Sequence, residues 1–174
     1  HTHPMRNLAG FLDLAAQLGL WIIARPGPYI MAETINEGIP PWVFERYPEV
    51  AVLDQKGNAQ PFLSYLHPQA HSVIKAWFKA VFGILSPRQI DQGGKIIMIQ
   101  LDNEIGMIAW VRNMLDLNPD NLERFTAYLN ATESRSYEST WVARSLCEPT
   151  SDTGRFILKA YSRYYRDVIK TYTE

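Results

Sequence analysis

The sequence predicts an α/β fold with a parallel sheet, and three features carry that prediction. Two predominantly apolar runs, 20–24 and 96–101, have the length and composition of buried strands. Segments with apolar residues three and four positions apart, which is helical spacing, precede each run and follow the second one. Prolines and glycines separate these segments at 26–28 and 93–94. Alternation of helix and strand in this way is typical of an α/β protein with a parallel sheet.

The first helix is expected to start after Asn7, a residue type that caps helix N-termini, and to end at Gly19, which suits the position after a helix. The apolar run 20–24 follows directly. Because this run does not alternate with polar residues, it indicates a strand buried on both faces. Pro26 and Pro28 end the strand, since proline lacks the N–H that a sheet ladder needs.

The stretch from Pro26 to Pro68 contains seven of the eleven prolines and many aromatic residues. We interpret it as an ordered functional loop, because long loops of this kind in compact domains usually carry function. Helical spacing returns over 73–85 and stops before Ser86-Pro87. The second apolar run, 96–101, then predicts a second buried strand, which Asp102-Asn103-Glu104 follows at once.

The rest of the chain has weaker patterns. The pair Asn118-Pro119 predicts the start of a helix, and Asp152 is a candidate cap for a last helix. Residues 130–150 are polar and poorly periodic, so no element is expected there. Several aromatic residues in the loop can either stack on a sugar or pack within the loop, and packing is favoured: Tyr29, Trp42 and Tyr65. Three other tryptophans are expected in the core: Trp21, Trp77 and Trp141.

Composition narrows the classes of function. The 174 residues carry 17 Lys and Arg against 18 Asp and Glu, so no basic face for nucleic acid or for an anionic membrane is expected. No apolar run approaches the roughly 18–20 residues of a membrane span. The chain begins on His1 and enters a helical pattern within a few residues. We therefore expect residues 1–174 to be a partial catalytic domain, incomplete at both ends.

Polar side chains follow both predicted strands. In parallel sheets, substrate sites lie at the C-terminal ends of the strands, and here these ends carry 25–33 and 102–104. A carboxylate at such a place suits acid or base work, and an amide beside it can bind a hydroxyl. A Glu that caps a helix or pairs with Arg would give the same pattern. Arg25 has two interpretations: it orients Glu104 or another buried carboxylate, or it forms a purely structural ion pair.

Metal binding and cofactors are not expected. His67 and His71 lie four residues apart, which could place two imidazoles on one helix face. Pro68 argues against a helix through that point, and no third ligand is evident.

Asn130-Ala131-Thr132 is a glycosylation sequon, although such short patterns also arise by chance. The single Cys147 cannot form an internal disulfide.

Two separated motifs resemble the pattern of the family 35 β-galactosidases. The first comprises Leu18-Gly19-Leu20, then 25–30 (Arg-Pro-Gly-Pro-Tyr-Ile), Ala32-Glu33, and 38–42 (Gly-Ile-Pro-Pro-Trp). The second is 93–104 (Gly-Gly-Lys-Ile-Ile-Met-Ile-Gln-Leu-Asp-Asn-Glu), which in the family typically ends in Glu-Asn-Glu. The helix of Trp77 between them is similarly placed.

This resemblance implies a retaining glycosidase built on a (β/α)₈ TIM barrel, with the two predicted strands as its third and fourth. It places the acid/base glutamate of the family on Glu104 and its sugar-binding asparagine on Asn103. The galactose-contacting pair of the family falls on Ala32 and Glu33. The nucleophilic glutamate of the family comes from a later strand that these 174 residues do not contain.

The sequence therefore predicts a hydrolase of terminal β-galactosides, with this chain carrying the acid/base half of the site and no cofactor or metal. The alternative is a non-catalytic half-barrel module that binds a carbohydrate or a partner. The chain departs from the family pattern around the sugar pocket, at Thr34, 37–38 and 105–107, which leaves the sugar open. No nucleic-acid or membrane partner is expected, the compartment is not indicated, and unpaired sheet edges favour self-association.

Overall fold

The structure is a computed structural model that describes residues 6–30, 34–103 and 115–171. The chain divides into two compact units, which are described separately. The first contains residues 1–38 and 73–105, and the second contains 39–72 and 106–174. The single partial catalytic domain that the sequence predicts stays a prediction.

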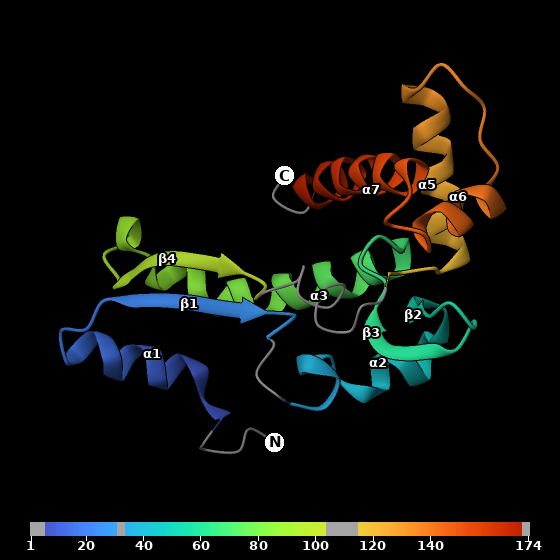
Figure 1. Cartoon of the computed structure of the whole chain (residues 1–174). Helices are drawn as coiled ribbons and strands as arrows, with labels where there is room; N and C mark the ends of the chain where they lie inside the picture. Colours follow the sequence, from blue (N-terminus) through green and yellow to red (C-terminus); the bar gives the residue numbers. More distant parts are fainter. Residues whose placement is uncertain (1–5, 31–33, 104–114, 172–174) are drawn as a thin grey trace. The chain divides into compact units, whose positions relative to one another are not determined.

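The first unit contains a two-stranded parallel sheet. Strand β1 (Ile22–Gly27) pairs with β4 (Ile96–Leu101), with Ile22 opposite Ile96 and Gly27 opposite Leu101. Figure 1 shows the two arrows side by side and pointing the same way. The α/β fold and the parallel pairing of the two apolar runs are confirmed. Short 3₁₀ helices complete this unit: η2 (Ile35–Gly38), η4 (Ser86–Arg88) and η5 (Ile90–Gln92).

Helix α1 (Leu8–Gln17) has the predicted ends. Asn7 Oδ1 accepts the N–H of Gly10 at 3.0 Å, which satisfies a backbone donor of the first turn. Gly19 follows the helix with a φ of 77°, a conformation that glycine adopts without steric cost.

Helix α3 (Pro68–Leu85) ends where Ser86-Pro87 predicts, but it starts five residues before Val73. Pro68 was expected to argue against a helix through His67 and His71, and the helix begins at Pro68 itself, which leaves His67 outside it. Proline in the first helical turn costs no hydrogen bond, because the first N–H groups of a helix have no partner within it. Its first residues belong to the second unit and those from Val73 onward to the first.

The strands are not buried on both faces, which corrects the sequence prediction. Ala24 and Ile96 belong to a core with Leu12, Val81 and Leu85, all at most 8% exposed. Side chains elsewhere on the strands are about half exposed: Ile23 54%, Ile97 48% and Met98 57%. The described sheet has only two strands, so it packs on α1 and α3 without a layer over its other residues.

The second unit begins with a helix and a hairpin in the stretch that was predicted as a loop. Helix α2 (Pro41–Arg46) and η3 (Pro48–Val50) precede β2 (Ala51–Leu53), which pairs antiparallel with β3 (Ala59–Leu63). The carboxylate of Asp54 accepts the N–H groups of Lys56 and Asn58 at 2.8 and 2.9 Å. These bonds satisfy the backbone donors of the turn.

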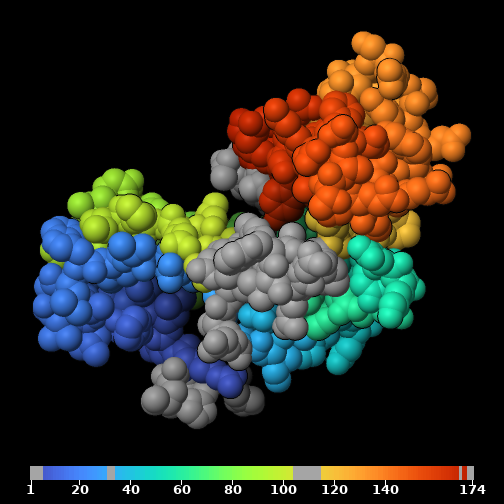
Figure 2. All heavy atoms as spheres, viewed as in Figure 1, coloured from blue at the N-terminus to red at the C-terminus, as the bar shows by residue number. Residues whose placement is uncertain are grey.

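Three helices form the rest of this unit: α5 (Pro119–Thr132), α6 (Ser139–Leu146) and α7 (Asp152–Lys170). Asn118 caps α5 as predicted, because its Oδ1 accepts the N–H of Asp120 at 3.1 Å. Helix α6 lies in the region where no element was expected. In Figure 2 the residues of α5 to α7 form one continuous orange-to-red body. Its core consists of side chains at most 9% exposed: Leu66, Leu122, Phe125, Leu129, Val142, Leu146, Ile157, Ala160 and Tyr164.

The aromatic residues separate into two groups. Tyr29 and Tyr65 are 0% and 4% exposed, so their packing role is confirmed, while Trp42 is 50% exposed. The three tryptophans expected in the core are instead exposed to a large extent: Trp21 58%, Trp77 45% and Trp141 38%. Among the helices of the described segments, none has an apolar stretch long enough to cross a bilayer.

Candidate functional site

The C-terminal ends of β1 and β4 meet at one edge of the sheet, and Asp102 joins them. Its N–H donates to the carbonyl of Gly27 at 3.2 Å, and its Oδ1 accepts the N–H of Tyr29 at 2.8 Å. The backbone of Asp102 is left-handed, with a φ of 57°, a region in which aspartate is enriched among non-glycine residues. This carboxylate therefore holds the two strand ends together.

Asn103 follows and is held by two neighbours. Its amide oxygen accepts a hydrogen bond from Gln100 Nε2 at 3.0 Å, and its own Nδ2 donates to the carbonyl of Ile30 at 3.1 Å. Gln100 Nε2 also donates to the carbonyl of Asp102 at 3.1 Å. An amide nitrogen carries two hydrogens, so the second N–H of Asn103 can bond another acceptor.

Arg25 extends this network on the side of β1. Its Nε donates to Gln100 Oε1 at 3.1 Å, and it forms no ion pair within the described residues. Neither interpretation of Arg25 is decided by the described residues, because Glu104 lies outside them. These hydrogen bonds connect Arg25 on β1, through Gln100, to Asn103, the residue that precedes Glu104.

Two further contacts fix the backbone at the end of β1 and just after it. The indole Nε1 of Trp77 on α3 donates to the carbonyl of Pro26 at 2.8 Å. The N–H of Ile30 donates to the carbonyl of Glu37 at 3.0 Å, which holds these two residues together. Gly38, with a φ of 102°, lies so close that a β-carbon would stand 2.6 Å from Ile30 Cγ1. Only glycine fits there without displacement of Ile30.

The structure describes one of the four predicted site residues. Asn103 lies at the predicted strand end, whereas Ala32, Glu33 and Glu104 lie outside the described residues. Sequence reasoning missed Gln100, which orients Asn103. A signal for it was present, because Gln100 is the one polar residue in the apolar run 96–101.

A second polar cluster surrounds Asp116 in the other unit. Its Oδ2 accepts the hydroxyl of Ser64 at 2.5 Å, and its Oδ1 accepts the N–H of Asn118 at 3.0 Å. Burial raises the pKa of the Asp116 carboxyl, against the lowering effects of the Ser64 and Asn118 hydrogen bonds and of His67 nearby. Asn121 Nδ2 donates to the hydroxyl of Tyr161 at 2.8 Å, and burial, with the charge of Asp116, raises the pKa of that hydroxyl. The cluster ties the segment before α5 to the end of β3.

The described residues contain no group of three or more His, Cys, Asp and Glu side chains that could hold a metal ion. His67 precedes α3, and its Nδ1 accepts the N–H of Gln69 at 3.1 Å. This nitrogen is therefore engaged in the start of the helix, while His71 lies one turn into α3.

Comparison with known proteins decides the family. The sequence matches the family described as "Glycosyl hydrolases family 35" over residues 2–170. The chain belongs to glycosyl hydrolase family 35. The match includes both motifs at the strand ends, so the family 35 resemblance that those motifs suggest is confirmed.

Relatives of this family 35 chain carry several different names. It is 41% identical over 108 residues to an exo-β-D-glucosaminidase of Thermococcus kodakarensis, a match over 59% of this chain and 14% of the relative. A β-1,2-glucosyltransferase of Ignavibacterium album is 34% identical over 151 residues, 79% of this chain and 21% of the relative. A β-galactosidase of Mus musculus is 33% identical over 101 residues, 58% of this chain and 14% of the relative. The family 35 chain thus spans a small part of the length of each relative.

Proposed function

We propose that the whole protein is a retaining β-glycosidase whose reaction takes place at the C-terminal ends of β1 and β4. The observation that carries this proposal is the Arg25–Gln100–Asn103 network, which fixes an amide at the edge where parallel strands expose their substrate site. Membership of family 35 supports the same assignment.

The proposal includes a (β/α)₈ barrel, with β1 and β4 as its third and fourth strands. Half-exposed apolar side chains on the sheet, Ile23, Ile97 and Met98, support it, because parallel sheets are normally covered on both faces. A barrel of this kind typically takes about 250 residues. The matched segments make up 14% to 21% of the relatives, which leaves ample chain for the other strands.

In this proposal Glu104 is the general acid and base. Retaining hydrolysis uses two carboxyl groups roughly 5–5.5 Å apart, and the second, the nucleophile, comes from a part of the protein beyond these residues. Glu104 first donates its proton to the glycosidic oxygen while the nucleophile bonds to the anomeric carbon. It then removes a proton from water, which attacks that carbon and releases the nucleophile.

Asn103 is the proposed partner of a sugar hydroxyl near the reacting carbon. One of its Nδ2 hydrogens is bonded to Ile30 and its Oδ1 to Gln100, so the side chain is held in place before a sugar arrives. The second hydrogen is the one that would reach the sugar. Ala32 and Glu33 are proposed as further sugar contacts, two and three residues after the Ile30 carbonyl that binds Asn103. Such preorganisation reduces the entropy lost when substrate binds.

The proposed substrate is a terminal β-galactoside. A second candidate, a terminal β-glucosaminide, is favoured by the name of the relative at 41% identity, an exo-β-D-glucosaminidase. The mouse β-galactosidase is 33% identical over a segment of similar length. A glycosyl-enzyme intermediate is common to both substrates, so the choice between them rests on contacts to the sugar.

The test is turnover by the intact protein of the 4-nitrophenyl β-glycosides of galactose, glucosamine and glucose. NMR of the first product formed should show a β-anomer, because retention requires two displacements at the same carbon. Preference for the galactoside supports the first candidate, and preference for the glucosaminide replaces it with the second. An α-anomer as first product, or no turnover of any of the three, would overturn the proposed reaction.

A further inference from the structure

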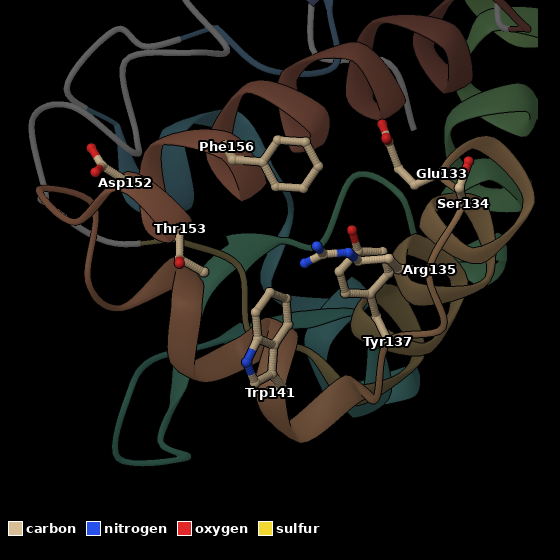
Figure 3. Close-up of a pocket in the computed structure, with 8 residues that line it drawn as sticks. All are labelled: Glu133, Ser134, Arg135, Tyr137, Trp141, Asp152, Thr153 and Phe156. Atoms are coloured by element: carbon tan, nitrogen blue, oxygen red, sulfur yellow. The ribbon is translucent and has the colours of Figure 1, made fainter.

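An open hollow of about 520 Å³ lies in the second unit, and none of the residues that line it is named in the proposed reaction (Figure 3). Its walls come from the loop between α5 and α6, the first turns of α6 and the first turns of α7. The volume falls within the range of about 300–1,000 Å³ that small-molecule sites occupy. The lining residues are Glu133, Ser134, Arg135, Tyr137, Trp141, Asp152, Thr153 and Phe156.

Aromatic rings form the apolar part of the lining. Trp141 on α6 and Phe156 on α7 are 38% and 39% exposed, although both belong to helices with a well-packed inner face. The ring of Tyr137 lies beside that of Trp141, with centroids 5.2 Å apart and planes inclined by 31°. These rings present broad faces to the hollow, which an apolar face of a ligand can cover.

The charges of the lining are not balanced. The carboxylate of Glu133 is paired with Arg163 at 3.0 Å, and that of Asp152 with Arg155 at 2.7 Å. Arg135 makes no ion pair or side-chain hydrogen bond within the described residues. Figure 3 shows its guanidinium extending toward the middle of the hollow, with Phe156 and Trp141 on opposite sides of it. The one uncompensated charge of the lining is therefore positive.

The walls of the hollow are fixed without a ligand. Asn130 Nδ2 donates to the carbonyl of Tyr137 at 3.2 Å, and its Oδ1 accepts the N–H of Tyr137 at 2.7 Å, which anchors the loop that carries Arg135. These two bonds also engage the amide of the Asn130 sequon. At the start of α7, Ser151 Oγ accepts the N–H of Gly154 at 2.9 Å. The site is thus preformed, which limits the cost of binding.

We propose that this hollow binds a saccharide that carries a carboxylate, of the uronic-acid class. The C–H face of a sugar ring would pack on Trp141 and Phe156, and its hydroxyls would meet Ser134 and Thr153. The guanidinium of Arg135 would bind the carboxylate through two parallel hydrogen bonds. A polyanion fits less well, because a single free cation opposes it. An extended peptide fits less well too, because the lining belongs to helices and a loop with no strand edge to pair with.

The test is calorimetric titration of the intact protein with digalacturonate and with its dimethyl ester. The ester keeps the sugar shape and removes the charge. Digalacturonate should bind about tenfold more tightly than the ester, which is the lower end of what a hydrogen bond to a charged group contributes. The variant Arg135→Gln should remove this difference, and Trp141→Ala should weaken binding of both ligands about tenfold or more. Equal binding of acid and ester by the unmodified protein would overturn the proposal.

Two matched variants control for indirect effects. Arg144→Gln removes an exposed arginine of α6 that does not line the hollow, and Trp42→Ala removes an exposed tryptophan of α2. Both should bind digalacturonate as the unmodified protein does. If acetyl-Ser-Ala, a peptide with a free carboxylate, binds as tightly as digalacturonate, the ligand class is wrong. Turnover of nitrophenyl glycosides should be unchanged in Arg135→Gln, so this test and that of the proposed reaction can fail independently.

Discussion

Replacement of Gln100 by leucine should disable the proposed site without unfolding the protein. The side chain makes three hydrogen bonds: it accepts from Arg25 at 3.1 Å and donates to the Asp102 carbonyl at 3.1 Å and to Asn103 Oδ1 at 3.0 Å. Leucine has a similar size but makes none of these bonds. The two donated bonds hold Asn103, and at about 1 kcal/mol each their loss amounts to about 2 kcal/mol. If that free energy is lost from transition-state positioning, turnover falls roughly 30-fold.

The assay is steady-state hydrolysis of 4-nitrophenyl β-galactoside by the intact protein, with thermal unfolding followed by circular dichroism. We expect kcat to fall and KM to change little. A misplaced Asn103 would lose a hydrogen bond to the sugar that forms mainly in the transition state. Gln100→Glu should lose turnover to a similar extent, since its carboxylate can accept from Arg25 but cannot donate to Asn103.

Gln92→Leu is the matched control, because Gln92 is an exposed glutamine outside the strand-end network. It should keep full turnover. A folded Gln100→Leu variant with nearly normal kcat would refute the reasoning, since the position of Asn103 would then not depend on the two donated bonds.

Two more predictions concern the unit of Asp116 and the isolated chain. Burial raises the pKa of Asp116, so the folded state binds a proton that the unfolded state has lost above about pH 4, and stability should fall as pH rises from there toward the folded pKa. Asp116→Asn should flatten this part of the profile in denaturant titrations at several pH values, and an unchanged slope would contradict the assignment. The 174-residue chain alone should hydrolyse no nitrophenyl β-galactoside at a useful rate. It should self-associate in light scattering, because the edges of the two-stranded sheet that the described residues form are unpaired. A monomer with robust turnover would contradict both expectations.

Local signals made much of the first unit predictable. Asn7 and Gly19 mark the ends of α1, and the apolar runs mark β1 and β4, because caps and short apolar runs act within a few residues. The same holds for Asn118, the cap of α5. The sequence could not show that Asn118 also donates to the carbonyls of Glu49 and Ala51, since that contact links positions 67 to 69 residues apart.

Elements that depend on distant contacts were missed. Helix α6 has only eight residues, too few for a clear helical period, and it is held by Val142 and Leu146, which are 0% and 1% exposed against α5 and α7. The hairpin β2–β3 has strands of three and five residues, too short for a clear period, and its turn depends on the Asp54 side chain.

The errors in burial have a related cause. Apolar composition predicted core positions for Trp141 and for both faces of β1 and β4, but burial requires a second layer that composition does not reveal. In the proposed barrel, strands outside the described sheet would cover the exposed strand residues. Trp141 instead lines the hollow of the second unit. In the candidate site, the position of Asn103 was predictable from its place after a strand. The hydrogen bonds of Gln100 to the Asp102 carbonyl and to Asn103 could be found only in the structure.

Chemical rescue of Glu104→Ala in the intact protein tests the central claim most directly. Without the acid/base carboxyl, a 4-nitrophenyl β-galactoside should still form the glycosyl-enzyme, because nitrophenolate leaves without a proton donor, and its hydrolysis should then become the slow step. Added azide, which needs no general base, should restore turnover and yield a β-galactosyl azide that NMR identifies. A Glu104→Ala enzyme with unimpaired turnover, or rescue that yields an α-azide, would contradict the assignment of Glu104 as the acid/base of a retaining glycosidase.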